Sequence, residues 1–426
     1  VSGLAALSRV SAQVDGAIPA GFRGVATLGL AREEWGATVE RMGWRFTALE
    51  VGAAISRLMG RLVELARAHA VTIMPAYAVG RLVQPTTLAH YLGGVIEPLR
   101  SQRQRLREGF ERLNRSPLGS GSLVGGALDP DRVALAQRLG FEGPIHNTFA
   151  AVSTPDDIVE LVDLAASSLT SVERFVVDVL AWHRTDPTSF LVDERWLTRP
   201  EPAQPVLEVP SRLDNLAGRL QYTAAWLDGS RREFGAVPYG PVSTRRGSSI
   251  ERASEVARQI VGVLDETTAF IAEGLIVNRA YLGNRAGRNL VTGGDLAFFL
   301  MAEEEIAPAA AIEITSLVLA RLQDSNLEVS GITQDIIDAA ALLTIGREVK
   351  VEMETLGRYL APRRYLERRQ VTGSAAPAMA RKWLDTVEQA NREEDGWLSG
   401  KVASIGRAYA DLERTIQDAA GESPDD

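Results

Sequence analysis

Few side chains in this sequence can act as a nucleophile or move a proton. The 426 residues include no cysteine, which excludes a thiolate nucleophile, a disulfide framework and a zinc site built on sulfur. Four histidines are present, and none pairs with another at the spacing of an HExxH motif. They are His69, His90, His146 and His183. We therefore expect no metal and no other cofactor, and histidine and carboxylate groups are the candidates for proton transfer.

Two adjacent glutamates, Glu33 and Glu34, stand at the start of a long helical pattern. Beside a pocket, one of them would serve as a general base with a raised pKa. Glutamates in the first turn of a helix are also ordinary partners of the helix dipole. Both interpretations stay open at this point.

A proline-rich stretch, residues 72–85, interrupts two long helical patterns. Pro75 and Pro85 each remove a helix donor and restrict the preceding residue, so the chain is predicted to cross here in a non-helical form. Such an interruption makes the stretch a candidate pocket wall.

The rest of the chain reads as helices that position these groups. Apolar residues recur at helical spacing over residues 33–70, 86–113, 154–182, 211–234 and 250–276, with a kink expected at Pro98. Compact helices are expected at 129–139, 295–304, 308–322, 331–344 and 400–419. We find no strand pattern of useful length. The prediction is an all-α protein whose long helices, each of roughly 40 Å, need oligomerisation to bury their apolar faces.

The composition of the chain argues against two classes of partner, nucleic acid and membrane. A net charge of −9 argues against nucleic acid, and the arginines within residues 100–115 are interpreted as the solvated face of a helix. No run of 18 apolar residues exists and no leader pattern opens the chain, so a cytoplasmic protein is expected.

Several segments carry a family likeness. Residues 72–77 (Thr-Ile-Met-Pro-Ala-Tyr) with Gln84-Pro85 resemble the Met-Pro-Gly-Tyr-Thr-His…Gln-Pro stretch of argininosuccinate lyase, within the aspartase/fumarase superfamily. Residues 116–123 resemble its Ser-Pro-Leu-Gly-x-Gly-x-Leu loop. Residues 146–153 resemble its Arg-Asn-Ser…Val-Ser element, and residues 293–297 (Gly-Gly-Asp-Leu-Ala) its C-terminal domain.

The resemblance implies a homotetramer with a central bundle of long helices and active sites assembled from three subunits. It implies three parts: a short N-terminal segment (1–31), the central bundle (32–277) and a small helical C-terminal domain (278–426). The N-terminal part is shorter than the family's first domain.

The chemical groups of the family are replaced at several positions. Ala78-Val79 stands where the family has Thr-His, and Leu207 stands at the position of its serine base. Arg212 falls near the position of its lysine. The catalytic motifs are therefore expected to be degenerate.

The resemblance also selects site candidates. His146 is the remaining histidine within a family motif and the best candidate for proton transfer besides Glu33 and Glu34, although a structural role is equally open. The expected substrate-binding residues come from the matching segments and from loops that close over substrate in the family. They are Arg32, Tyr77, Arg81, Gln84, Ser120, Ser122, Asn147, Arg212, Tyr239 and Arg245.

Three functions remain open. The first is a lyase-type enzyme with altered chemistry, which would eliminate, add or cyclise across an activated C–C bond of a small, non-standard metabolite. The second is a non-catalytic, ligand-binding or structural homo-oligomer on the lyase scaffold. The third is a C–N lyase that releases fumarate with substitute acid and base residues. The sequence names neither the substrate nor the base.

Overall fold

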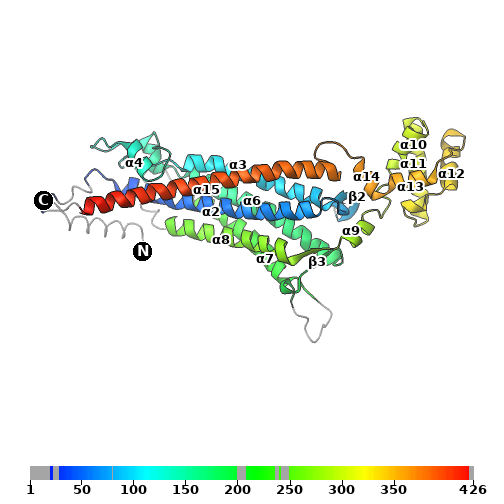
Figure 1. Cartoon of the computed structure of the whole chain (residues 1–426), viewed down its shortest axis with the longest axis horizontal. Coiled ribbons are helices and arrows are strands. Elements are labelled where there is room, and N and C mark those ends of the chain that lie inside the picture. Colours follow the sequence, from blue (N-terminus) through cyan, green and yellow to red (C-terminus); the bar gives the residue numbers. More distant parts are fainter. Residues whose placement is uncertain are drawn as a thin grey trace.

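The computed structural model describes residues 20–22, 28–78, 80–198, 208–235, 239–240 and 249–421. Five long helices form a bundle: α2 (Arg32–Ala68), α3 (Leu88–Leu113), α6 (Asp156–Thr185), α7 (Ser211–Gly235) and α8 (Ser249–Ala269). A sixth, α15 (Pro377–Gly421), runs along α2 and α3 for most of the bundle's length (Figure 1). The fold is mostly helical, as predicted.

Short elements complete the chain. The remaining helices are α4 (Arg132–Arg138), α5 (Thr148–Ser153), α9 (Arg279–Arg285), α10 (Asp295–Glu303), α11 (Pro308–Asp324), α12 (Gln334–Ile345), α13 (Met353–Leu360) and α14 (Pro362–Glu367). Single turns are η1 (Ala20–Phe22), η3 (Glu194–Trp196), η5 (Phe270–Gly274) and η6 (Val329–Gly331). The strands are β1 (Ile73–Ala78), β2 (Arg81–Thr87), β3 (Phe190–Val192) and β4 (Leu275–Val277).

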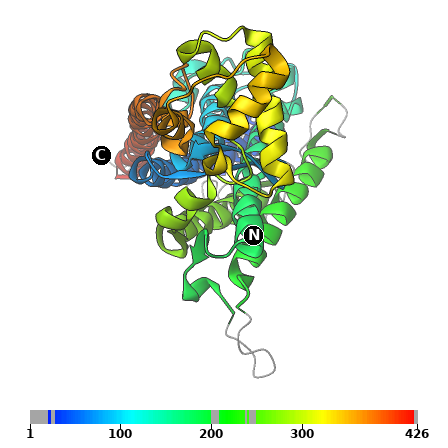
Figure 2. The same ribbon diagram turned by 90° about the vertical axis from the view of Figure 1, so that its right-hand side faces the viewer.

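Two hydrophobic cores hold the described chain together. The first lies inside the bundle and includes Leu384, Leu398 and Ile405 of α15. The second lies among α10–α13, whose yellow helices face the viewer in Figure 2. The domain boundaries expected from the sequence stay predictions, but the buried residues of α15 belong to the bundle core and not to the core of α10–α13.

The proline-rich stretch forms a β-hairpin. Strands β1 and β2 pair antiparallel and place Pro75 opposite Pro85, with a bulge between Ala76 and Tyr77 and Gly80 at φ +72° in the turn. A two-stranded ribbon has two free edges, which is where proline is tolerated. The predicted non-helical crossing is confirmed, while the expectation of no strands was wrong. The α3 helix runs through Pro98, and the kink there stays a prediction.

Two buried arginines anchor α15 to the bundle. Arg45, which is 0% exposed, donates to Asn114 Oδ1 at 2.9 Å and to the Tyr409 hydroxyl of α15 at 3.1 Å. Arg103, which is 3% exposed, donates to Asn391 Oδ1 of α15 at 2.8 Å. Burial lowers the pKa of both guanidinium groups. The expectation that the arginines of residues 100–115 all face solvent was therefore wrong for Arg103.

Candidate functional site

The start of α2 is tied to the glycine-rich loop of residues 116–126. Glu34 is fully buried, and its Oε1 accepts from the Ala31 backbone amide while its Oε2 accepts from the Gly121 amide, both at 2.9 Å. Each carboxylate oxygen is thus engaged by a backbone donor. This arrangement favours a positioning role for Glu34 over the role of a base.

Four more of the predicted residues lie at this end of the bundle. The Ser122 hydroxyl donates to Glu33 Oε2 at 3.2 Å, and the buried Ser120 hydroxyl donates to the Gly121 carbonyl at 3.4 Å. Arg32 is the first residue of α2 and is exposed beside them. Glu33 is only partly buried and accepts a hydrogen bond from a single serine hydroxyl. It is therefore the more accessible of the two carboxylates for a ligand.

Arg132 at the start of α4 joins this loop to the turn that carries His146. Its guanidinium donates from Nε to the Leu118 carbonyl at 3.2 Å and from Nη2 to the Ile145 carbonyl at 2.9 Å. Burial lowers the pKa of Arg132, and the charge of Glu34 opposes that shift. Sequence reasoning missed this residue, since nothing distinguishes it from an ordinary arginine in the first turn of a short helix.

His146 and Asn147 are exposed at the same end. The Asn147 side chain accepts from the Ala150 amide at 2.9 Å and so caps α5, which gives it a structural role in this chain. The Ile145 amide donates to the Ser116 carbonyl at 2.9 Å and pins the turn against the glycine-rich loop. The loop end therefore gathers Arg32, Glu33, Glu34, Ser120, Ser122, His146 and Asn147.

Three predicted residues lie at the hairpin, at the other end of the bundle. Tyr77 hydrogen-bonds with the guanidinium of Arg285 on α9, and burial raises the pKa of the Tyr77 hydroxyl. Arg285 pairs in turn with Asp186, Nε to Oδ2 at 3.3 Å. Arg81 and Gln84 are exposed on β2.

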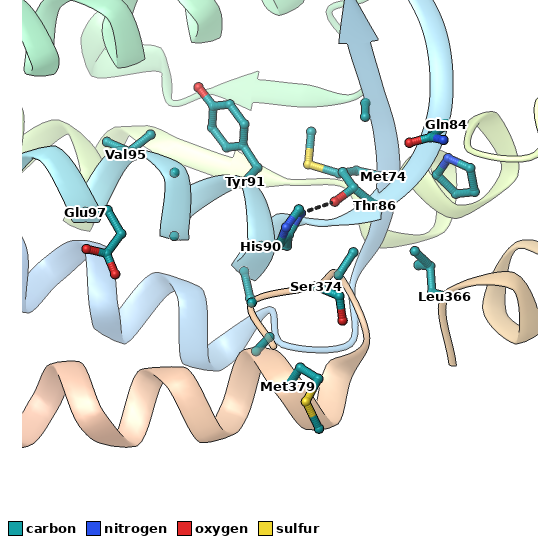
Figure 3. A pocket seen from close by; sticks show the side chains of 18 of the residues that line it. Met74, Gln84, Thr86, His90, Tyr91, Val95, Glu97, Leu366, Ser374 and Met379 are labelled. Carbon is teal, nitrogen blue, oxygen red and sulfur yellow. Dashed lines mark hydrogen bonds between the residues drawn. The ribbon is translucent and has the colours of Figure 1, made fainter. Parts of the chain in front are cut away.

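A pocket of about 900 Å³ lies against the base of this hairpin (Figure 3). Its lining reaches Tyr77 on β1 and Gln84 on β2, and it continues over α3, α6 and the segment that joins α14 to α15. His90 and Thr86 are joined by a hydrogen bond at its wall, Nδ1 to Oγ1 at 2.9 Å.

The remaining predicted residues do not join either group. Arg212, at the start of α7, pairs with Glu266 at 3.2 Å and stacks over the Trp196 ring at 4.0 Å. Tyr239 is 81% exposed. Arg245 and the tip residue Val79 lie outside the described residues, as does Leu207.

The loop end and the hairpin end cannot meet within one chain. Glu34 is in the first turn of α2, whereas the hairpin follows its last turn, and a helix of 37 residues spans about 55 Å. Figure 1 places α4 and β2 at opposite ends of the bundle. Across the described part of the chain, no three His, Asp or Glu side chains are grouped to hold a metal ion.

Comparisons with known proteins agree with this architecture. Residues 38–192 match a family model described as lyase. An argininosuccinate lyase from Methanocorpusculum labreanum is 26% identical over 371 residues, which cover 85% of this chain and 72% of the relative. The chain is therefore similar to the lyase family over residues 38–192 and to argininosuccinate lyase over a longer stretch.

Other argininosuccinate lyases match over a shorter stretch of this chain. The argininosuccinate lyase of a Geobacillus strain is 33% identical over 170 residues, which cover 40% of this chain and 37% of that lyase. The chain thus spans only about a third of the length of this and the two next curated relatives.

Solved lyase structures share the fold. EDDS lyase in complex with formate matches with a TM-score of 0.78 at 23% identity, covering 92% of this chain and 77% of that one. The class II fumarase of Schistosoma mansoni matches with a TM-score of 0.61 at 12% identity, covering 79% and 70%. For the part of the chain that the structure describes, no helix is both long and apolar enough to cross a membrane.

Proposed function

We propose that the protein is a lyase-superfamily enzyme with altered chemistry. It would eliminate, add or cyclise across an activated C–C bond of a small, non-standard metabolite in the cytoplasm. Its reaction sites would lie between subunits of a homo-oligomer, expected to be a tetramer, where the loop end of one chain meets the hairpin tip of another. The separation of these two ends along α2 is the observation that carries the shared-site part of the proposal.

We propose a different reaction because this chain keeps the segments that resemble the argininosuccinate lyase pocket but carries other side chains at several of their polar positions. Strand β1 ends at Ala78, next to the turn. The family that the sequence resembles has a threonine at this position and a histidine at the next. Glu34 is committed to two backbone amides. Glu33, His146 and Arg32 are left as the groups at the loop end that can reach a ligand, with Glu33 or His146 as proton carrier and Arg32 as the carboxylate-binding cation.

A non-catalytic role is the second candidate, and one observation favours it. Several predicted site residues already have structural partners. Glu34 accepts from backbone amides, and Asn147 caps a helix. Arg212 forms an ion pair. A fumarate-releasing C–N lyase, as the names of the curated relatives suggest, is the third candidate.

One experiment separates the three. The purified oligomer is incubated with argininosuccinate, adenylosuccinate and a total metabolite extract, and products are followed by mass spectrometry. Our proposal expects no fumarate, together with the loss of a metabolite that an Arg32→Ala variant leaves intact. Release of fumarate from either defined substrate would establish the third candidate. Identical spectra with and without protein would support the second.

A further inference from the structure

The pocket at the base of the hairpin is distinct from the proposed reaction site. Of the hairpin it touches only residues 74–77 and 84–86, and the described tip residues Ala78 and Arg81 are not in its wall. Tyr77 and Gln84, two of the predicted substrate-binding residues, are the hairpin residues of its lining that stand nearest the tip. Its volume of about 900 Å³ falls in the range of small-molecule sites.

Aromatic rings form much of the wall. Tyr91 of α3 meets Trp182 of α6 edge to face, with ring centroids 4.8 Å apart. Trp383 of α15 also lines the pocket and lies close to the Gly93 backbone. Rings fixed in this way offer flat, rigid contact surfaces and suit a planar ligand. Met74, Leu366 and Met379 add apolar surface between them (Figure 3).

The charges in the wall sum to zero, and three of the four charged side chains are engaged. The Tyr91 hydroxyl donates to Asp178 Oδ2 at 2.6 Å, and Trp383 Nε1 donates to Glu97 Oε1 at 2.8 Å. Arg369 holds the buried Asp295 through both terminal nitrogens, at 2.7 and 3.0 Å. Arg174 lies one helical turn from Asp178 on α6. Two arginines and two carboxylates therefore line the pocket, and a ligand with several negative charges meets no net positive charge there.

Neutral polar groups remain for a ligand. His90 is exposed in the wall and hydrogen-bonds with Thr86 and with the backbone of Gly373. Desolvation lowers the pKa of His90, which favours the neutral form of the ring. The Gln84 amide is exposed at the rim. These groups donate and accept hydrogen bonds without carrying charge.

We infer that this pocket is an accessory binding site for a neutral aromatic molecule of two to three rings. The ligand would lie against Trp383 and hydrogen-bond with Gln84 or His90. The inference goes beyond the proposed function and does not need the protein to be a lyase. It also predicts that polycarboxylates, the chemistry of fumarate and its adducts, do not compete for the pocket.

The test uses two fluorescent probes with one skeleton. N-phenyl-1-naphthylamine is neutral, and 1-anilinonaphthalene-8-sulfonate is the same molecule with an added sulfonate. With the purified protein, we expect the neutral probe to bind roughly tenfold more tightly than the sulfonate, and an excess of fumarate to leave its binding unchanged. Equal or tighter binding of the sulfonate, or displacement by fumarate, would overturn the inference.

A variant that fills the pocket tests whether the neutral probe binds there. Gly94 lines the pocket, and no heavy atom lies within 4 Å of a Cβ built on it, so Gly94→Leu should place a side chain in the cavity while favouring the helix. Gly396→Leu is the matched control, because Gly396 is an equally open helical glycine on α15 outside the pocket. We expect the first variant to weaken neutral-probe binding about tenfold and the second to leave it unchanged. Equal affinity in both variants, or no binding to the native protein, would refute the assignment.

Discussion

Glu34 and Gly121 lie 87 positions apart, and the buried carboxylate of the first accepts the amide hydrogen of the second across 2.9 Å. The same carboxylate closes the first turn of α2 through the Ala31 amide. One side chain thus sets the distance between the start of α2 and the glycine-rich loop. A catalytic base would need a free oxygen, and neither oxygen of Glu34 is free of a backbone donor.

Replacing Glu34 by glutamine should destabilise the fold. A glutamine amide offers one acceptor oxygen where two backbone donors converge, so one buried N–H loses its partner at a cost of about 1–3 kcal/mol. Denaturant unfolding measures this change. Glu33→Gln is the control, because Glu33 meets only a serine hydroxyl that can rotate. Loss of turnover in Glu34→Gln with unchanged stability would restore the base interpretation.

Gly121→Ala should disorder the loop more than Gly125→Ala. Both glycines have positive φ, +63° and +96°, so both substitutions carry backbone strain. A Cβ on Gly121 would also approach the Gly125 carbonyl oxygen to 2.7 Å, whereas nothing lies within 4 Å of a Cβ on Gly125. We expect the first variant to lose about 1–3 kcal/mol more in the free energy of unfolding. Equal losses would mean that the loop relaxes around the added methyl group.

Asn391→Ala should loosen α15. The amide oxygen of Asn391 accepts from the buried guanidinium of Arg103 at 2.8 Å, and its removal leaves a buried cation short of a partner. The expected cost is about 2–3 kcal/mol in unfolding free energy, since bonds to charged groups exceed ordinary ones. Gln389→Ala, an exposed position on the same helix, is expected to change stability by less than about 0.5 kcal/mol. Limited proteolysis of α15 gives an independent readout.

Acid should destabilise the protein through His69. Desolvation, followed by the charge of Arg279, lowers the pKa of this buried histidine from 6.5 to about 4. Because the unfolded state binds the proton first, the contribution of His69 is complete above pH 6.5 and is lost as the pH falls toward 4. His69→Asn should flatten the stability profile in that window by roughly 1–3 kcal/mol. A wild-type profile that is flat between these limits would contradict the lowered pKa.

The bundle could be predicted because its helices repeat apolar residues at helical spacing and end near proline or glycine. Sequence reasoning shortened α15 to its last part because the charges at 393–395 and Gly396 interrupt the apolar positions before residue 400. It missed the hairpin because proline is rare in strands, and only pairing across the chain makes Pro75 opposite Pro85 acceptable. The buried arginines were also missed, because their hydrogen-bond partners come from segments that are distant in the sequence.

The site was predicted in pieces. Residues 31–34, 116–123 and 146–148 could be selected from local motifs, but their joining through Arg132 depends on carbonyl groups of Leu118 and Ile145, whose positions no motif records. The pocket behind the hairpin needs α15 as a wall, so it could not be found while that helix was placed too late in the chain.

The length of α2 has a genetic consequence if reaction sites are shared between subunits as proposed. A chain damaged at Arg32 keeps an intact hairpin, and a chain damaged at the hairpin keeps an intact loop end. Mixed assemblies of the two would contain some sites that draw both halves from undamaged segments. Two inactive copies of the gene could then restore activity to each other, whereas two lesions at the same end could not.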